Sequence, residues 1–217
     1  PTPDILEDNV AFWKIIYTGI SLEEGVIHDR DYPLAVYDTI FIGKRSGRSK
    51  SNYIRHKKDE IEALLRSAAS KSPGQWDDRE KELARRLMEY APEDALRRAY
   101  VRVRFQQGQK ERFKEGLERS SMYLDTIRSI FRQYAVPRRL IYLPHVESSF
   151  NPKAYSKVGA AGLWQFMRGT GQQYMKISYL IDERRDPILS TWAAAKLLSH
   201  NYSQLKSWPL AITAYNH

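Results

Sequence analysis

The stretch Leu143–Met167, with the sequence LPHVESSFNPKAYSKVGAAGLWQFM, decides how we interpret the rest of the chain. It contains a single carboxylate, Glu147, which is followed at once by Ser-Ser-Phe-Asn-Pro. The next acidic residue is Asp182, so residues 148–181 contain neither Asp nor Glu. A residue before proline is disfavoured in the α region, and the Asn-Pro step therefore predicts that a short helix ends near Glu147. We expect this helix end to expose Glu147 at the edge of a cleft.

The residues around Glu147 suit an acid that stays protonated near neutral pH. Apolar surface disfavours a charged carboxylate and so raises the pKa of an acid beside it. The glycines at 159 and 162 allow positive φ or a close approach of the backbone to a ligand, and Gln165 offers an amide donor and acceptor. We therefore predict a groove for a neutral ligand rich in hydroxyl and amide groups. The apolar residues of the stretch are Leu143, Val146, Phe150, Leu163, Trp164 and Phe166.

The run ESSFNPKAYSKVGAAGLWQFM, residues 147–167, resembles the signature of the lytic transglycosylase SLT domain, glycoside hydrolase family 23, and within it the membrane-bound lytic murein transglycosylase D type. Two further motifs, DERRDP at 182–187 and TAYN at 213–216, follow in the order of that family. The resemblance covers residues 105–217. It implies a mainly α fold with a lysozyme-like catalytic domain of the goose or SLT type.

The resemblance also implies an activity, the cleavage of the β-1,4 bond between N-acetylmuramic acid and N-acetylglucosamine in peptidoglycan without water. Glu147 would first protonate the glycosidic oxygen. As a carboxylate it would then accept a proton from the muramyl C6 hydroxyl, which attacks C1 and leaves a 1,6-anhydromuramyl end. One residue would thus serve as acid and then as base.

The other candidate site residues come from the same resemblance and would bind the glycan. Ser156 would lie near the catalytic acid, and Gln165 would bond an acetamido group. Tyr215 would contact substrate or Glu147. For two of these residues a structural role is also open: a methionine such as Met167 often fills a gap in packing, and a serine such as Ser156 often forms a turn. Trp164 replaces a residue that varies in the family, so we expect it in the core. The predicted substrate-binding residues are Ser156, Gly162, Gln165, Met167, Tyr215 and Asn216.

A glycosidase with two carboxylates would need a second acid about 5 to 9.5 Å from the first. The downstream candidates Asp182 and Glu183 belong to DERRDP, where ion pairing with Arg184 or Arg185 and helix capping is the interpretation we favour. The acid-free stretch supports a mechanism with one carboxylate, but distance along the sequence is not distance in space.

His145 precedes Glu147 by two residues, and such residues on a helix point away from each other, so we expect His145 to be structural. The five histidines form no HExxH arrangement and the chain has no cysteine. We therefore assign no metal and no cofactor.

The composition favours an anionic partner, because the formal net charge is +9. A basic surface attracts nucleic acid, acidic lipid or an anionic cell-wall polymer. The motif favours peptidoglycan glycan strands, whose lactyl groups and peptide stems carry carboxylates, and we expect no nucleic-acid partner. The densest basic run, residues 43–58, is expected to be a solvated loop that leads into a helix. The sequence leaves the oligomeric state open.

Helical patterns outnumber strand patterns throughout the chain. We divide it into an N-terminal helical region, residues 1–104, and the SLT catalytic domain, residues 105–217. Residues 21–42 are expected to form an irregular or short extended connection, and any β element should be small and near the glycine-rich run. The expected helices span residues 4–18, 59–69, 77–90, 123–134, 163–174 and 190–202.

No apolar run approaches the roughly 18 residues of a membrane span, and the start PTPDILEDN does not have the pattern of a signal peptide. We expect a mature or trimmed form of an exported protein in the periplasm or cell envelope. The family's Tyr-Asn pair precedes a glycine, whereas this chain stops at His217, so we expect the domain to be truncated there.

Three alternatives stay open on the sequence. A hydrolytic muramidase on the same fold would need the same acid and would use water in place of the C6 hydroxyl. A peptidoglycan-binding module without catalysis would follow from a site that the chain's end leaves incomplete. Nucleic-acid binding through the basic runs predicts a salt-sensitive affinity for DNA.

Overall fold

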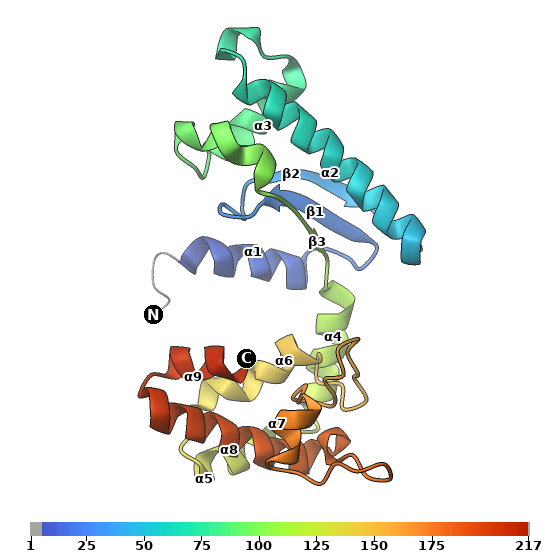
Figure 1. Ribbon diagram of the computed structural model, residues 1–217, viewed down its shortest axis with the longest axis vertical. Coiled ribbons are helices and arrows are strands. Elements are labelled where there is room, and N and C mark those ends of the chain that lie inside the picture. The colour runs from blue at the N-terminus through green and yellow to red at the C-terminus, as the bar shows by residue number, and fades with distance from the viewer. Residues whose placement is uncertain (1–5, 217) are drawn as a thin grey trace. The chain divides into compact units, whose positions relative to one another are not determined.

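The computed structural model describes residues 6–216, and the chain divides into two compact units (Figure 1). The first unit is Pro1–Glu111 and the second is Arg112–His217. The division lies seven residues beyond the boundary expected from the sequence, because the strand at residues 103–107 pairs within the first unit. Each unit is described by itself below.

The first unit contains a three-stranded antiparallel sheet that the sequence analysis did not predict. Its strands are β1 (Glu24–Asp29), β2 (Val36–Phe41) and β3 (Val103–Gln107), in the order β2-β1-β3. Val26 of β1 pairs with Thr39 on one side and with Gln106 on the other. The expected connection at residues 21–42 is therefore a hairpin, and the N-terminal region is not purely helical. Local sequence patterns do not predict this sheet, because β3 lies more than sixty residues further along the chain than β2.

Helices account for the rest of the first unit, and their positions mostly follow the sequence patterns. The expected first helix begins at Glu7, and its expected start at Asp4 lies outside the described residues. The basic run at residues 43–58 is mainly helical, since α2 already begins at Gly47. Asp77 caps α3 by accepting a hydrogen bond from the Glu80 N–H at 2.8 Å. The helices are α1 (Glu7–Thr18), α2 (Gly47–Ala69) and α3 (Asp78–Met88), with 3₁₀ helices at Pro73–Gln75 and Glu93–Val101.

A buried ion pair joins the last residue of β1 to the residue before β3. The Arg102 Nε–H donates to both carboxylate oxygens of Asp29 at 2.9 Å, and the Tyr37 hydroxyl donates to Asp29 at 3.0 Å. The Asp29 side chain is fully buried. The backbone N–H groups of Asp31 and Tyr32 complete its set of donors. The pair fixes the end of β1 to the residue that precedes β3.

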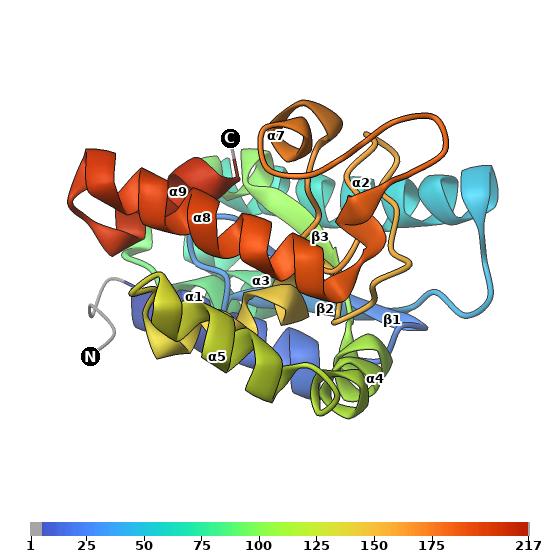
Figure 2. The same ribbon diagram turned by 90° about the horizontal axis from the view of Figure 1, so that it is seen from below.

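The second unit is helical and packs around one long helix. Helices α5 and α9 both contact α8, and the views in Figures 1 and 2 show them beside it. The expected apolar stripe at residues 123–134 is confirmed as core, since Ile127, Ile130 and Phe131 are buried. The helices are α4 (Lys110–Ser120), α5 (Leu124–Gln133), α6 (Leu143–Glu147), α7 (Arg168–Gln172), α8 (Pro187–Leu205) and α9 (Trp208–Tyr215), with 3₁₀ helices at Arg138–Tyr142 and Glu183–Arg185.

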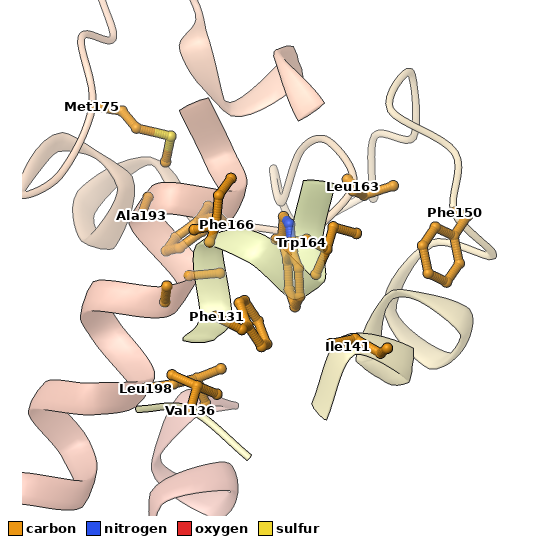
Figure 3. Close-up of a cluster of buried hydrophobic side chains, with 14 of the residues drawn as sticks. Phe131, Val136, Ile141, Phe150, Leu163, Trp164, Phe166, Met175, Ala193 and Leu198 are labelled. Atoms are coloured by element: carbon orange, nitrogen blue, oxygen red, sulfur yellow. The ribbon is translucent and has the colours of Figure 1, made fainter. Parts of the chain in front are cut away.

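The core of the second unit forms around Trp164, whose side chain is fully buried (Figure 3). Its ring lies 5.3 Å from that of Phe131, and its indole N–H donates to the Thr191 hydroxyl at 2.9 Å. This satisfied polar end lets a large aromatic side chain lie in a core. The expectation that Trp164 serves packing is confirmed.

The glycine-rich run is a series of turns, not the start of a helix. Ala161 pairs with Phe166 through two backbone hydrogen bonds of 3.0 and 3.1 Å, and Gln165 has a φ of 49°. A left-handed residue cannot continue an α-helix, so the helix expected at residues 163–174 begins only at Arg168. Isolated bridges at residues 155–166 are the small β element expected here.

The fold is mainly α, as the sequence predicted. Across residues 6–216, none of the helices combines the length and the apolar character needed to cross a membrane.

Candidate active site

A cavity of about 300 Å³ in the second unit gathers most of the predicted site residues. Glu147 lines it, together with five of the six predicted substrate-binding residues. These five are Ser156, Gln165, Met167, Tyr215 and Asn216. They come from the end of α6, the glycine-rich turns and the end of α9, so residues almost seventy positions apart meet in one hollow.

Glu147 is the last residue of α6, and the chain turns sharply just after it. Pro144 lies in the first turn of this five-residue helix, and its carbonyl accepts the Ser148 N–H at 3.1 Å. Ser149 and Phe150 then both adopt left-handed backbone angles, with φ of 52° and 54°. Two such residues in a row are incompatible with a helix. The predicted helix end at Glu147 is confirmed.

The turn after Glu147 is held from two sides. Arg119 of α4 donates from Nε and Nη2 to the Ser149 carbonyl at 3.0 and 2.9 Å. The Ser148 hydroxyl donates to the Leu163 carbonyl at 2.7 Å. Helix α4 approaches closely because its Gly116 lacks a side chain: an added Cβ would lie 3.1 Å from the Ser149 oxygen. Sequence reasoning missed these two α4 residues, since a helical Arg or Gly carries no local sign of a contact thirty residues away.

The surroundings of the Glu147 carboxylate disfavour its charge. The side chain is partly buried, and this burial raises its pKa above the usual range of a glutamate. Among the described residues that line the cavity, none is Lys, Arg or His and no second one is Asp or Glu. Charged side chains of the cavity lining therefore do not contribute to the pKa shift of Glu147. A carboxyl in this setting can donate a proton and later take one back.

Tyr215 lies close to Glu147 and points inward from the last residue of α9. Its hydroxyl donates to the Trp164 carbonyl at 2.7 Å, and its ring meets Phe166 edge-on at 5.9 Å. Burial, with the nearby Glu147 charge, raises the pKa of the Tyr215 hydroxyl well above its usual value. The hydroxyl is therefore neutral and anchored, and its oxygen is available as an acceptor.

Ser156 and Gln165 shape the cavity through their own turns. The Ser156 hydroxyl oxygen accepts the Ala160 N–H at 2.9 Å. The Gln165 Nε2–H donates to the Gly162 carbonyl at 2.9 Å, which supports the left-handed backbone of Gln165. Each side chain keeps further hydrogen-bonding capacity: the Ser156 hydroxyl proton, and the Gln165 oxygen with its second amide hydrogen. These groups could serve a hydroxyl-rich or amide-rich ligand.

Met167 and Asn216 stand at the more open part of the cavity. Met167 is 46% exposed and immediately precedes α7, so its flexible thioether is a movable apolar wall. Asn216 is the exposed residue that ends α9, with its N–H bonded to the Thr213 carbonyl at 3.1 Å. Its side-chain amide lines the cavity and can face a ligand or support the loop.

Gly162 is the one predicted site residue that the structure places outside the cavity lining. Its φ is 81°, and an added Cβ would lie 1.7 Å from the Arg184 carbonyl oxygen. The close approach that this glycine allows is thus to the protein's own backbone.

The DERRDP motif supports the cavity from beneath. Asp182 pairs with Arg184 through hydrogen bonds of 2.8 and 2.7 Å, and Asp186 caps α8. Asp182 also caps the following 3₁₀ helix, so the predicted ion pairing and capping are confirmed for Asp182. Glu183 instead accepts a backbone N–H at 2.6 Å, and neither residue lines the cavity. Arg184 is buried, and its Nη1 donates to the Gly159 and Phe166 carbonyls at 2.8 and 3.0 Å. It thereby ties both ends of the cavity floor together, a role that the sequence did not reveal.

His145 has the structural position expected of it. Its ring packs against Phe150 at 4.5 Å and Phe113 at 5.3 Å, and it is 9% exposed. Its Nδ1 is buried without a hydrogen-bond partner among the described residues. Burial lowers the pKa of the imidazole. His145 does not line the cavity, and its ring contacts anchor α6 to Phe113 and Phe150.

The chain is similar in sequence to several known proteins. The chain is 36% identical over 100 residues to the membrane-bound lytic murein transglycosylase D of Escherichia coli strain K12, and equally so to that of strain O6:H1. It is 34% identical, also over 100 residues, to a putative tributyltin chloride resistance protein of Alteromonas sp. strain M-1. Each match covers 45% of this chain. The matched region is 22% of each transglycosylase and 48% of the Alteromonas protein, so the chain spans only part of its relatives.

A family model also matches one part of the chain. Residues 125–217 match the family model of the transglycosylase SLT domain. They lie wholly within the second unit and contain Glu147 and every other residue of the cavity lining. The part of this chain that is similar to the transglycosylase SLT domain therefore lies in the second unit.

Proposed function

We propose that this chain is a peptidoglycan lytic transglycosylase of the glycoside hydrolase family 23 type, which cleaves the β-1,4 bond between N-acetylmuramic acid and N-acetylglucosamine and leaves 1,6-anhydromuramyl ends. The observation that carries the proposal is the lone carboxylate, Glu147, in a cavity without a second acid or a cation among its described lining residues. Two relatives are named lytic murein transglycosylases, in agreement with this assignment.

The chemistry needs one group that first gives and then takes a proton. Burial raises the pKa of Glu147, so the side chain can start protonated and donate to the glycosidic oxygen as the bond from that oxygen to C1 breaks. The resulting carboxylate accepts the proton of the muramyl C6 hydroxyl while that oxygen bonds to C1. No water is consumed, and Glu147 ends in its starting form.

The remaining lining suits an uncharged sugar. Ser156, Gln165 and Asn216 supply hydroxyl and amide groups for ring hydroxyls and acetamido groups, while Phe166 and Met167 supply apolar contact area. Binding sites of this composition are apolar with a few polar groups that fix orientation. In this proposal the partner is the peptidoglycan glycan strand, with no cofactor or metal, and the chain acts in the cell envelope. The support for that location is the relatives' description as membrane-bound murein enzymes.

The test is mass spectrometry of the soluble products released from purified sacculi. We expect muropeptides with 1,6-anhydro ends from the wild-type chain and none from Glu147→Gln, which keeps the size of the side chain and removes its acid. Glu118→Gln is the matched control, because Glu118 is an exposed residue of α4 that does not line the cavity.

Other outcomes would indicate a different function or a different catalytic residue. Products with reducing ends, heavier by one water, would identify a hydrolytic muramidase that uses the same acid. Products from Glu147→Gln equal to wild type would remove Glu147 from the mechanism. Binding to sacculi without products from either protein would favour a peptidoglycan-binding module.

A further inference from the structure

A second cavity of the SLT unit is lined by three arginines. Arg128 and Arg132 lie one turn apart on α5, and Arg138 is the first residue of the following 3₁₀ helix. The cavity measures about 260 Å³ and shares no residue with the lining of the Glu147 cavity. Its floor is apolar, formed by Phe131, Val136 and Ile141 of the core shown in Figure 3.

The charges around this cavity are not balanced by the protein. Among the described lining residues none is acidic. Within residues 6–216 Arg128 has one ion-pair partner, Asp125, which is 92% exposed and therefore mostly solvated. The Arg128 Nε is buried and has no hydrogen-bond acceptor among the described residues. A buried donor without a partner in a folded protein calls for an explanation, and an ion or solvent at that place is a common one.

We propose that this arginine cavity binds an oxyanion, either a carboxylate or a phosphate. Guanidinium groups match both in a planar, two-pronged geometry, and three of them around one hollow would relieve their mutual repulsion by sharing an anion. Arg132 and Arg138 are exposed, so an anion can reach them from solvent, and the apolar floor can take the carbon atoms next to the anionic group. The arginine cavity is separate from the Glu147 cavity, and this proposal does not depend on the activity proposed for the Glu147 cavity.

The neighbouring Arg139 supplies a matched control. It follows Arg138 directly and is exposed, but it does not line the cavity. Replacing it removes the same charge from the same part of the surface. A general attraction of anions to a basic protein would respond to either replacement, whereas a defined site responds only to the lining residues.

The experiment is an NMR titration of the whole chain that follows the arginine Nε–H signals and the Ile141 methyl groups. Inorganic phosphate and acetate are the two probes, each at constant ionic strength set with sodium chloride. We expect saturable shifts in the wild-type chain and a loss of affinity of about tenfold or more in the double variant Arg132→Gln/Arg138→Gln. Arg139→Gln should bind as the wild type does. Saturation at lower phosphate than acetate assigns the site to phosphate groups, and the reverse assigns it to carboxylates.

Two results would overturn the proposal: shifts that rise linearly without saturation, or saturable shifts that the double variant retains. If the double variant fails to fold, the single variants Arg132→Gln and Arg138→Gln replace it, each judged against Arg139→Gln. Glu147→Gln is expected to bind both probes unchanged. Failure of the arginine site and failure of the proposed transglycosylase activity can therefore be told apart.

Discussion

At the scale of single residues, the Glu147 site combines a carboxyl that resists ionisation with a tyrosine that cannot lose its proton near neutral pH. Glu147 was found from the sequence because its motif is long and its neighbours are apolar. The roles of Arg184 and Gly162 were not found, because each depends on a backbone carbonyl far away in sequence. Residue types indicate what a side chain can do, while its partner is set by the fold.

The raised pKa of Glu147 gives the proposed activity a defined pH dependence. Because the first step needs the protonated form, the rate falls as pH rises through this pKa, and the fall begins above the pKa range of an ordinary glutamate. The measurement is kcat/KM against pH on soluble glycan strands, with a carboxyl NMR titration of Glu147 beside it. A fall in activity at an unshifted glutamate pKa would contradict this account.

Replacing Glu147 by Gln should lower kcat by a factor on the order of 10² to 10⁴, the usual contribution of general acid-base catalysis. The same variant should lose activity but gain thermal stability at alkaline pH. An acid whose pKa is raised by folding stabilises the fold less as pH rises through that pKa, so Glu147→Gln is expected to unfold at higher temperature than wild type at alkaline pH. Thermal unfolding at low and high pH checks the sign, and an equal Tm difference at both would refute it.

The hydroxyl of Tyr215 is expected to matter for stability as well as for activity. Tyr215→Phe removes the 2.7 Å hydrogen bond to the Trp164 carbonyl and should cost about 1 to 3 kcal/mol of unfolding free energy, because that acceptor loses its partner in the core. Urea unfolding measures the loss. Tyr202→Phe is the control, since Tyr202 is stacked on Trp208 at the surface; an equal loss in both would show that the hydrogen bond is not responsible.

At the scale of elements, two helix boundaries around the site were predictable, and others were not. Proline lies in the first turn of both α6 and α8, which is a local signal for a helix start. The end of α6 was expected from the Asn-Pro step, and in the structure it coincides with the left-handed residues Ser149 and Phe150. The late start of α7 follows from the left-handed Gln165, which nothing in the sequence distinguishes from a helical glutamine. The sheet of the first unit depends on pairing between β1 and the distant β3, and short apolar runs do not reveal such partners.

The contact between α4 and the turn after Glu147 predicts that Arg119 positions the proposed acid, Glu147. Arg119→Ala leaves the Ser149 carbonyl without its two donors, so the left-handed turn loosens and kcat should fall by roughly tenfold or more, the effect of about 1.4 kcal/mol on the barrier. KM should change little. Arg119→Lys should recover part of the loss because it restores one donor.

The control for this prediction is Lys114→Ala, an exposed cation on the same helix. Steady-state kinetics on soluble glycan, with Tm measured for each variant, separates positioning from unfolding. Equal losses of kcat in the alanine and lysine variants, or a loss carried entirely by KM, would remove Arg119 from this role.

At the scale of the whole molecule, the chain consists of two units with separate cores. The family resemblance predicted the second unit well, because its motifs lie in the same order as the elements that build the cavity. The first unit has no such motif, and its composition suggested only helices. Its basic run proved to be largely the start of α2, since charge alone does not distinguish a solvated helix from a solvated loop.

The stability of the first unit is expected to depend on the pair of Asp29 and Arg102. Arg102→Met leaves a buried carboxylate without its cation and should cost about 3 to 5 kcal/mol of unfolding free energy. Arg104→Met, at an exposed position of β3, is the control and should change it by less than about 1 kcal/mol. Urea unfolding, together with hydrogen exchange of the β1 amides, measures the change in unfolding free energy for both variants. A small effect of Arg102→Met would show that the pair is dispensable.

The contact between Tyr215 and the Trp164 carbonyl also has a consequence for the order of events during synthesis. Glu147 and the turn that holds it are synthesised well before α9, so the wall of the cavity that contains Tyr215 is added later. Contacts so distant in sequence form late, because the entropy of closing the loop is lost before any contact is gained. We therefore expect the nascent chain to carry its acid in an open, unshielded setting, and the pKa of Glu147 to rise only when α9 docks.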